Sequence, residues 1–139
     1  MQIIHHICEC LLDLHAAGYV HRNLKPANIM WLPSQNRWTL IDFGCAARVG
    51  EEARTGFTLA YAAPEAVAAR YRPPTPPLRA TEALDAWAVG VLAVELFTGR
   101  PALVQFQDGR ENVRTCMHAC VAAVAIHKIS IWYPFIRTV

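Results

Sequence analysis

Two short apolar runs on either side of a polar turn limit the folds open to this chain. Residues 29–32 and 38–41 are mostly apolar, and residues 33–36 between them read P-S-Q-N. This pattern predicts a β-hairpin. Because hairpin strands are antiparallel, Asn28 before the first strand and Asp42 after the second come to the same end. An amide oxygen and a carboxylate there, with Lys25 close in sequence, suit Mg²⁺ and phosphate oxygens.

Four motifs around this hairpin are similar to those of the protein kinase family. Residues 21–28 read H-R-N-L-K-P-A-N, where the kinase catalytic loop usually reads H-R-D-L-K-P-x-N. Residues 42–44 read D-F-G and residues 63–65 read A-P-E. Residues 85–90, D-A-W-A-V-G, resemble the start of the large helix beneath the kinase core. The chain therefore resembles a protein kinase, and the Leu-Lys pair in the loop resembles the serine/threonine type.

The resemblance implies a mainly α fold (α+β), a fragment of the kinase large lobe (C-lobe) with a small β-hairpin at the catalytic loop. Residues 1–110 would form this partial domain, and residues 111–139 would be a divergent C-terminal tail of unknown role. Neither a glycine-rich loop nor a V-A-I-K-like strand precedes Tyr19. The small lobe (N-lobe), which would cover ATP, is therefore expected to be absent from this sequence.

The resemblance also gives roles to single residues. Asn28 and Asp42 would hold Mg²⁺, and Lys25 would contact the phosphates of ATP. Arg22 would pair with a phosphorylated residue of the activation segment, 42–65, because a guanidinium suits a bidentate phosphate contact. Two threonines of this segment are regulatory candidates: Thr55 as a phosphosite and Thr58 as a contact of the catalytic loop at Asn23 and Lys25.

A further set of residues is expected to be structural. His21 would hold the catalytic loop against the backbone of the D-F-G motif, and Asp85 would accept backbone amides of that loop. The other positions matched to structural motif residues are Phe43, Gly44 and Glu65.

Asn23 stands where an active kinase carries the Asp that accepts the substrate hydroxyl proton. An amide can orient a hydroxyl but has no carboxylate to take its proton. General-base assistance is worth about 10²–10⁴-fold, although positioning and charge stabilisation carry most of phosphoryl transfer. Three interpretations stay open: a serine/threonine kinase acting on protein hydroxyls, a pseudokinase that binds Mg·ATP or a protein partner without turnover, and a non-functional truncated product.

Apolar spacing predicts the helices. Ile3, Ile7, Leu11 and Leu14 recur every three or four residues, which indicates a helix over 2–17 that ends at Gly18. A second helix begins after Thr81 and continues to Phe97. It is apolar nearly all round, which predicts burial on every side. The pattern also favours a helix over 112–127.

Composition and charge narrow the choice of partners. The net charge is +2 with scattered Lys and Arg, so we expect no nucleic-acid partner. The apolar runs are shorter than the ~20 residues of a spanning helix, so we expect no membrane partner. Five Cys without a framework spacing indicate free thiols, hence the cytoplasm or alternatively the nucleus. The prolines of residues 73–77 resemble an SH3 ligand, although an exposed insertion between helices is the plainer interpretation.

Overall fold

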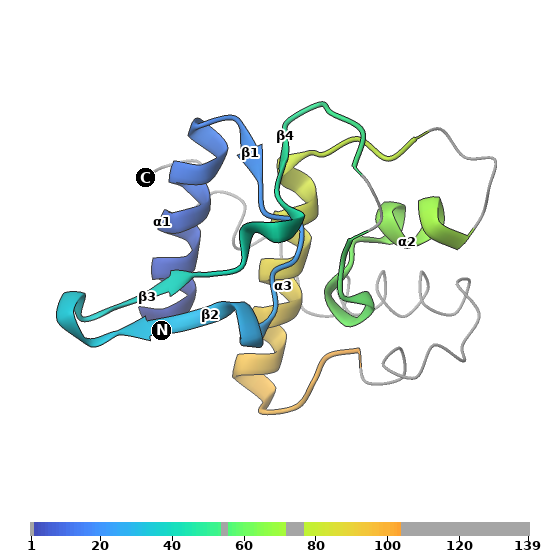
Figure 1. Ribbon diagram of the computed structural model, residues 1–139. Coiled ribbons are helices and arrows are strands. Elements are labelled where there is room, and N and C mark those ends of the chain that lie inside the picture. Colours follow the sequence, from blue (N-terminus) through green and yellow to red (C-terminus); the bar gives the residue numbers. More distant parts are fainter. Residues whose placement is uncertain (1, 54–55, 72–76, 104–139) are drawn as a thin grey trace.

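The computed structural model describes residues 2–53, 56–71 and 77–103 of the chain (Figure 1). In this part, helices α1 and α3 lie side by side, the hairpin of β2 and β3 crosses α1 at one end, and α2 lies on the far side of α3. The bounds are α1 Gln2–Ala16, β1 Tyr19–Val20, β2 Ile29–Leu32, β3 Arg37–Leu40, β4 Ala47–Arg48, α2 Pro64–Tyr71 and α3 Glu82–Thr98. The described part is thus rich in helix with a few small strands, which confirms the mainly α prediction.

The predicted hairpin is present, with its second strand one residue earlier than expected. Strands β2 and β3 pair antiparallel, with Ile29 opposite Leu40. Asn36 adopts a left-handed backbone with φ 50°, which completes the reversal so that pairing resumes at once at Arg37. Beyond the strands, the Ile41 amide donates to the Asn28 carbonyl at 3.0 Å. The hairpin therefore brings Asn28 and the segment leading to Asp42 together.

The predicted N-terminal helix is confirmed as α1, which ends at Ala16, just before Gly18 with φ 83°. Its buried face belongs to a hydrophobic cluster drawn from α1, the β1–β2 loop, β3 and α3. The buried members of the cluster are Ile7, Leu11, Leu24, Leu40 and Ala88. Leu24 is 1% exposed, so the β1–β2 loop is fixed to the core in its middle.

Helix α3 covers the predicted range, but the prediction that it is buried on every side is wrong. Leu84, Asp85 and Ala88 in its first half are buried, whereas Leu96 and Phe97 are 43% and 62% exposed. The first half packs between α1 and β1, and the last turn extends past these elements (Figure 1). A helix that is apolar on all sides can be buried on all sides, but the elements packed around it determine how much of its surface is actually buried.

Several predictions fall outside the described residues. They are Thr55, residues 73–76 of the proline cluster, and everything expected beyond residue 103, including the helix over 112–127 and the tail 111–139. Within the described part of the chain, no helix has both the length and the hydropathy needed to cross a membrane.

Candidate functional site

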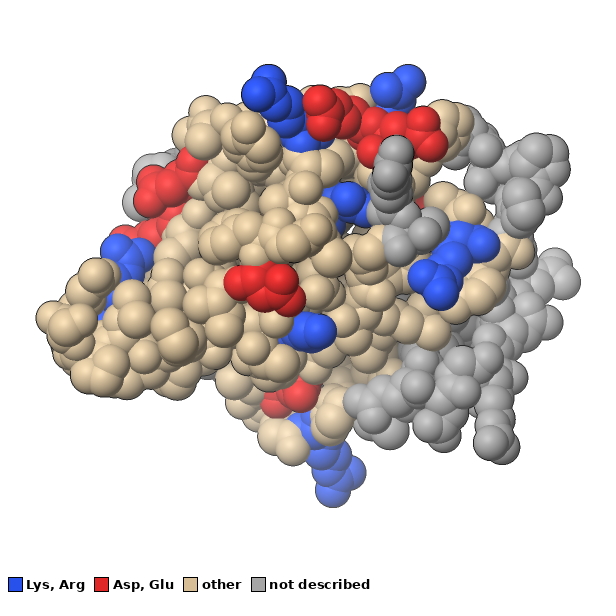
Figure 2. All heavy atoms as spheres, viewed as in Figure 1, with Lys and Arg blue, Asp and Glu red and all other residues tan. Residues whose placement is uncertain are grey.

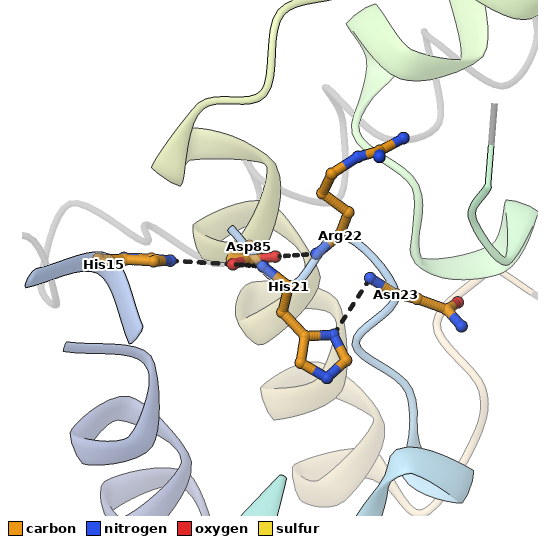
Figure 3. Close-up of polar contacts among 5 residues, drawn as sticks. All are labelled: His15, His21, Arg22, Asn23 and Asp85. Carbon is orange, nitrogen blue, oxygen red and sulfur yellow. Dashed lines mark hydrogen bonds and ion pairs between the residues drawn. The ribbon is translucent and has the colours of Figure 1, made fainter. Parts of the chain in front are cut away.

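The β1–β2 loop is held at its start by a buried carboxylate from α3. Asp85 is 0% exposed, and it accepts the backbone amides of His21 at 2.8 Å and of Arg22 at 2.7 Å (Figure 3). These charge-assisted bonds fix a stretch in which Arg22 has φ 69°, a left-handed conformation that is unfavourable for a residue with a side chain. The sequence predicted this contact of Asp85 with the loop.

His15 is a further partner of Asp85 that sequence reasoning missed. Its Nε2 lies 2.9 Å from Oδ2 of Asp85, on the opposite side from the loop amides (Figure 3). A carboxylate only accepts, so His15 donates here. The available signal was its place in the last turn of α1, three residues before Gly18, at which the chain turns toward the loop.

His21 ties the loop to the end of β3. Its Nδ1 lies 3.3 Å from the backbone amide of Asn23, and its Nε2 lies 3.2 Å from the carbonyl of Ile41. Because the Asn23 amide must donate, the ring proton is on Nε2, which donates to Ile41. The ring is fully buried, and its centroid is 5.1 Å from that of Phe43. This geometry suits the structural role expected for His21.

Asn23 and Thr58 meet as the sequence predicted. The Thr58 hydroxyl donates to Oδ1 of Asn23 at 2.9 Å, joining the activation segment to the loop. Nδ2 of Asn28 donates to the Asn23 carbonyl at 2.8 Å. The expected contact of Thr58 with Lys25 is not among the hydrogen bonds of the described residues. Asn23 itself is 8% exposed.

Asn28 and Asp42 present oxygen atoms that fit a hard cation. Because Nδ2 of Asn28 faces the Asn23 carbonyl, Oδ1 is the atom left to ligate a metal. Asp42 is exposed, has φ 62°, and accepts the Gly44 amide with one carboxylate oxygen at 3.3 Å. The described residues contain no group of three or more His, Cys, Asp or Glu that could enclose a metal. Mg²⁺ here would need water or phosphate oxygens to complete its shell.

The remaining predicted residues have simpler surroundings. Lys25 is half-buried, and none of the ion pairs among described residues includes it. Arg22 donates from Nη1 to the carbonyl of Cys45 at 3.0 Å. Burial lowers the pKa of Arg22, while the neighbouring Asp85 and Cys45 act in the opposite direction and raise it, and the guanidinium remains cationic at neutral pH. Glu65 is exposed in the first turn of α2.

Two further contacts fix the activation segment, and neither was predicted. The hydroxyl of Tyr61 donates to Oε2 of Glu95 at 2.7 Å. Residues 50–53 also form a short antiparallel ladder with residues 78–80, in which the Gly50 amide donates to the Ala80 carbonyl at 2.8 Å. The segment is thus attached to α3 and to the strand-like stretch just before it.

The surface around the site carries little charge. On the face shown in Figure 2, acidic and basic side chains stand in small mixed groups, and no broad basic patch is visible on it. Exposed apolar side chains are found beside the site residues, with Phe43 51% and Met30 43% exposed.

The fold, the hairpin and the loop held by Asp85 define a protein-kinase-like domain. The family model of the protein kinase domain matches residues 1–136, so the chain belongs to the protein kinase family, as the motifs indicated. The match includes most of residues 111–139, the segment expected to be a divergent tail.

Known relatives of the chain are serine/threonine kinases. It is 32% identical over 129 residues to serine/threonine-protein kinase Kist of Mus musculus, covering 86% of this chain and 30% of Kist. It is 44% identical over 96 residues to serine/threonine-protein kinase SBK2 of Homo sapiens, and this match covers 67% of this chain and 27% of SBK2. The solved structure of the Cydia pomonella granulovirus kinase PK-1 matches with a TM-score of 0.56 at 29% sequence identity. This match covers 67% of this chain and 32% of the PK-1 chain. The chain therefore spans about a third of the length of these relatives.

Proposed function

We propose that this chain is part of the large lobe of a serine/threonine-type kinase domain, holding the phosphate end of Mg·ATP beside a protein substrate, with phosphoryl transfer slowed by Asn23. The observation that carries the proposal is the loop itself. The backbone amide and carbonyl of Asn23 are both hydrogen-bonded inside the site, to His21 and Asn28. The Asn23 side chain therefore departs from the kinase pattern, whereas the backbone of the β1–β2 loop around it is held by hydrogen bonds.

The residues of the site have the chemical groups that Mg·ATP needs, namely oxygen ligands for the metal and an ammonium group for a phosphate. Mg·ATP, when bound, supplies the phosphoryl group that would pass to a hydroxyl. Oδ1 of Asn28 and the carboxylate of Asp42 would ligate the metal, and Lys25 would contact a phosphate oxygen. Asp85, through the amides of His21 and Arg22, keeps the loop in the conformation that presents these groups.

Asn23 is the weak point of the reaction. Its amide stays neutral across the physiological pH range, so the substrate hydroxyl loses its proton without a general base. The absence of a general base is expected to lower the rate of phosphoryl transfer about 10²–10⁴-fold. Nucleotide binding does not depend on this base. We therefore expect binding to persist while turnover is strongly reduced.

Metal-dependent nucleotide binding tests the proposal. Mn²⁺ can replace Mg²⁺ as a probe, and its binding is followed by the relaxation of water protons in the presence of ATP. We expect the whole chain to bind Mn·ATP, and Asp42→Asn to weaken binding roughly tenfold or more. The matched control is Asp13→Asn on the exposed face of α1, which should leave binding unchanged. No binding by the parent chain, or equal loss in both variants, would contradict the proposal.

A pseudokinase that engages a protein partner is the second candidate function. The exposed Phe43 and Met30 beside the site favour it, because apolar surface near a binding site is often covered by a partner. Thermal unfolding with and without Mg·ATP distinguishes a pseudokinase from a non-functional truncated product. A ligand at 100 times its Kd adds about 2.7 kcal/mol, and a pseudokinase would show this gain without phosphoryl transfer. A non-functional truncated product would show no cooperative unfolding.

The cytoplasm is the location we propose, with the nucleus as the alternative. Cys8, Cys10 and Cys45 are free thiols in the described residues, which suits a reducing compartment. The SH3-type contact at residues 73–77 stays a prediction from the sequence.

A further inference from the structure

Phe57 directly precedes Thr58 in the activation segment, and its ring packs inside the fold. The residue is half-buried and lies against two hydrophobic clusters. The buried members of the first cluster are Ala62, Val67, Val91 and Leu103, and those of the second are Val20, Ala53, Ala63, Ala66, Ala80 and Leu84. This one ring therefore connects the activation segment to α2, to α3 and to the end of β1.

Two further contacts of the ring involve α2 and the β1–β2 loop. The guanidinium carbon of Arg70, in the last turn of α2, lies 5.8 Å from the centroid of the Phe57 ring, within the range of a cation–π interaction. Phe57 and Arg22 also line a small cavity together with Leu78 and Leu84. The ring thus lies near the β1–β2 loop as well as against the helices.

Thr58, the next residue, reaches the β1–β2 loop itself. Its hydroxyl donates to Oδ1 of Asn23 at 2.9 Å, and its carbonyl accepts the Tyr61 amide at 3.0 Å. Consecutive Cα atoms are about 3.8 Å apart, so a Phe57 ring that is fixed by packing also confines Thr58. The covalent connection therefore transmits the packing of Phe57 to the hydroxyl that orients Asn23.

A hydrogen bond alone is a weak attachment for this segment. Fixing the backbone of one residue costs about as much free energy as one hydrogen bond contributes. Apolar burial supplies the additional stabilisation that an ordered contact needs. Leu59, on the other side of Thr58, packs against the first cluster, whereas Phe57 packs against both. The contact of this segment with the end of β1 therefore depends on Phe57.

We propose that Phe57 is a positioning residue of the kinase site, and that its packing against the two clusters keeps the Thr58 hydroxyl on Oδ1 of Asn23. The inference rests on the proposed function, because it concerns the loop at which that reaction would occur. Phe57 lies outside the four motifs that indicated the family, and it acts through Thr58 without taking part in phosphoryl transfer. The orientation of the Asn23 amide then depends on α2 and α3, so a change that repacks α2 would alter the site from a distance.

The side-chain NH₂ signals of Asn23 in NMR spectra test this role. They are recorded from the ¹⁵N-labelled whole chain and assigned by their loss in Asn23→Asp. Thr58→Val removes the hydroxyl donor and gives the reference displacement. We expect Phe57→Ala to displace the signals in the same direction and by at least half as much, because Thr58 is no longer confined. Unmoved signals in a folded Phe57→Ala chain would overturn the inference.

Two control variants separate positioning from other effects of the ring. Val91→Ala removes apolar side chain from the first cluster, on α3, and should lower the thermal unfolding temperature while leaving the Asn23 signals in place. An equal displacement in Val91→Ala would show that Phe57 supports only the fold in general. Phe57→Leu keeps an apolar side chain but removes the ring, so its Asn23 signals should stay close to those of the parent chain. A displacement as large as that in Phe57→Ala would come from the loss of the ring current and would overturn the inference.

Folding of each variant is checked by thermal unfolding. Should Phe57→Ala fail to fold, Phe57→Val is a smaller truncation and takes its place with the same expectation.

The outcome is separable from that of the proposed function, because these signals are recorded without nucleotide. Binding of Mn·ATP by the parent chain, with unmoved Asn23 signals in Phe57→Ala, would refute this inference and leave the proposed function standing. Displaced signals without Mn·ATP binding would support the role of Phe57 in positioning Thr58 and refute the nucleotide site.

Discussion

The carboxylate of Asp85 lies 2.8 Å from the backbone amide of His21, a residue 64 positions earlier in the chain. The same carboxylate accepts the Arg22 amide and the His15 ring. One fully buried side chain thus connects α3, the end of α1 and the start of the site loop. The conformation of the loop depends on this single acceptor, because Arg22 has a left-handed backbone that needs support from its surroundings.

Asp85→Asn should destabilise the fold strongly. An asparagine keeps one acceptor oxygen but turns an NH₂ toward groups that themselves donate, which leaves buried donors unpaired. We expect a loss of about 3 kcal/mol or more in the free energy of unfolding, measured in urea. The same substitution at the exposed Asp13 should cost less than about 0.5 kcal/mol. A comparable loss in both variants would mean that Asp85 is not the anchor of the loop.

Asn23→Asp should restore the missing base. The chain is fused behind the small lobe of one of its serine/threonine kinase relatives, and transfer of the γ-phosphate of ATP to a protein substrate is measured. We expect a rate gain of about 10²–10⁴-fold over the same fusion with Asn23. Asn36→Asp, at the far end of the hairpin, adds the same charge and should give no gain. An inactive Asn23→Asp fusion that still binds Mn·ATP would show that something other than the base limits turnover.

Tyr61→Phe should weaken the attachment of the activation segment to α3. Burial, the hydrogen bond to Glu95 and the charge of Glu95 together raise the pKa of Tyr61. Removing the hydroxyl deprives a carboxylate of its 2.7 Å donor, so we expect a loss of about 1–2 kcal/mol in urea unfolding. Tyr71→Phe, at an exposed ring, is the control and should change little.

The same pair gives a pH dependence with a definite sign. Because the pKa of Tyr61 is higher in the folded state, the unfolded chain loses this proton first as the pH rises. The contribution of Tyr61 is therefore complete below the unfolded pKa of about 10 and declines above it. The stability difference between the parent chain and Tyr61→Phe should shrink when unfolding is measured above pH 10. A difference that stays constant or grows would contradict this assignment.

Local patterns were enough to predict much of the chain. Apolar spacing placed the end of α1 to within one residue, and the apolar runs around the P-S-Q-N turn placed the bounds of both hairpin strands to within one residue. The motifs indicated the kinase family, and the family match agrees. These features were accessible because helix periodicity, turn chemistry and motif spacing are all properties of neighbouring residues.

Contacts across the chain were less accessible. The sequence indicated that Asp85 and Thr58 would meet the loop only through the family resemblance, and it gave no sign of His15 on Asp85 or Glu95 on Tyr61. The exposure of Leu96 and Phe97 was also misjudged, since burial depends on which elements stand beside a helix.

Residue order alone was sufficient to predict α1, α3, the β2–β3 hairpin, the kinase family and the Asn23 that stands in place of the expected Asp. The orientation of that asparagine depends on the folded chain, because the hydroxyl that donates to its Oδ1 comes from Thr58, 35 positions away. Residues close in sequence fix local conformation through the backbone, whereas the direction of a side-chain amide is fixed by whichever donors and acceptors the fold places around it.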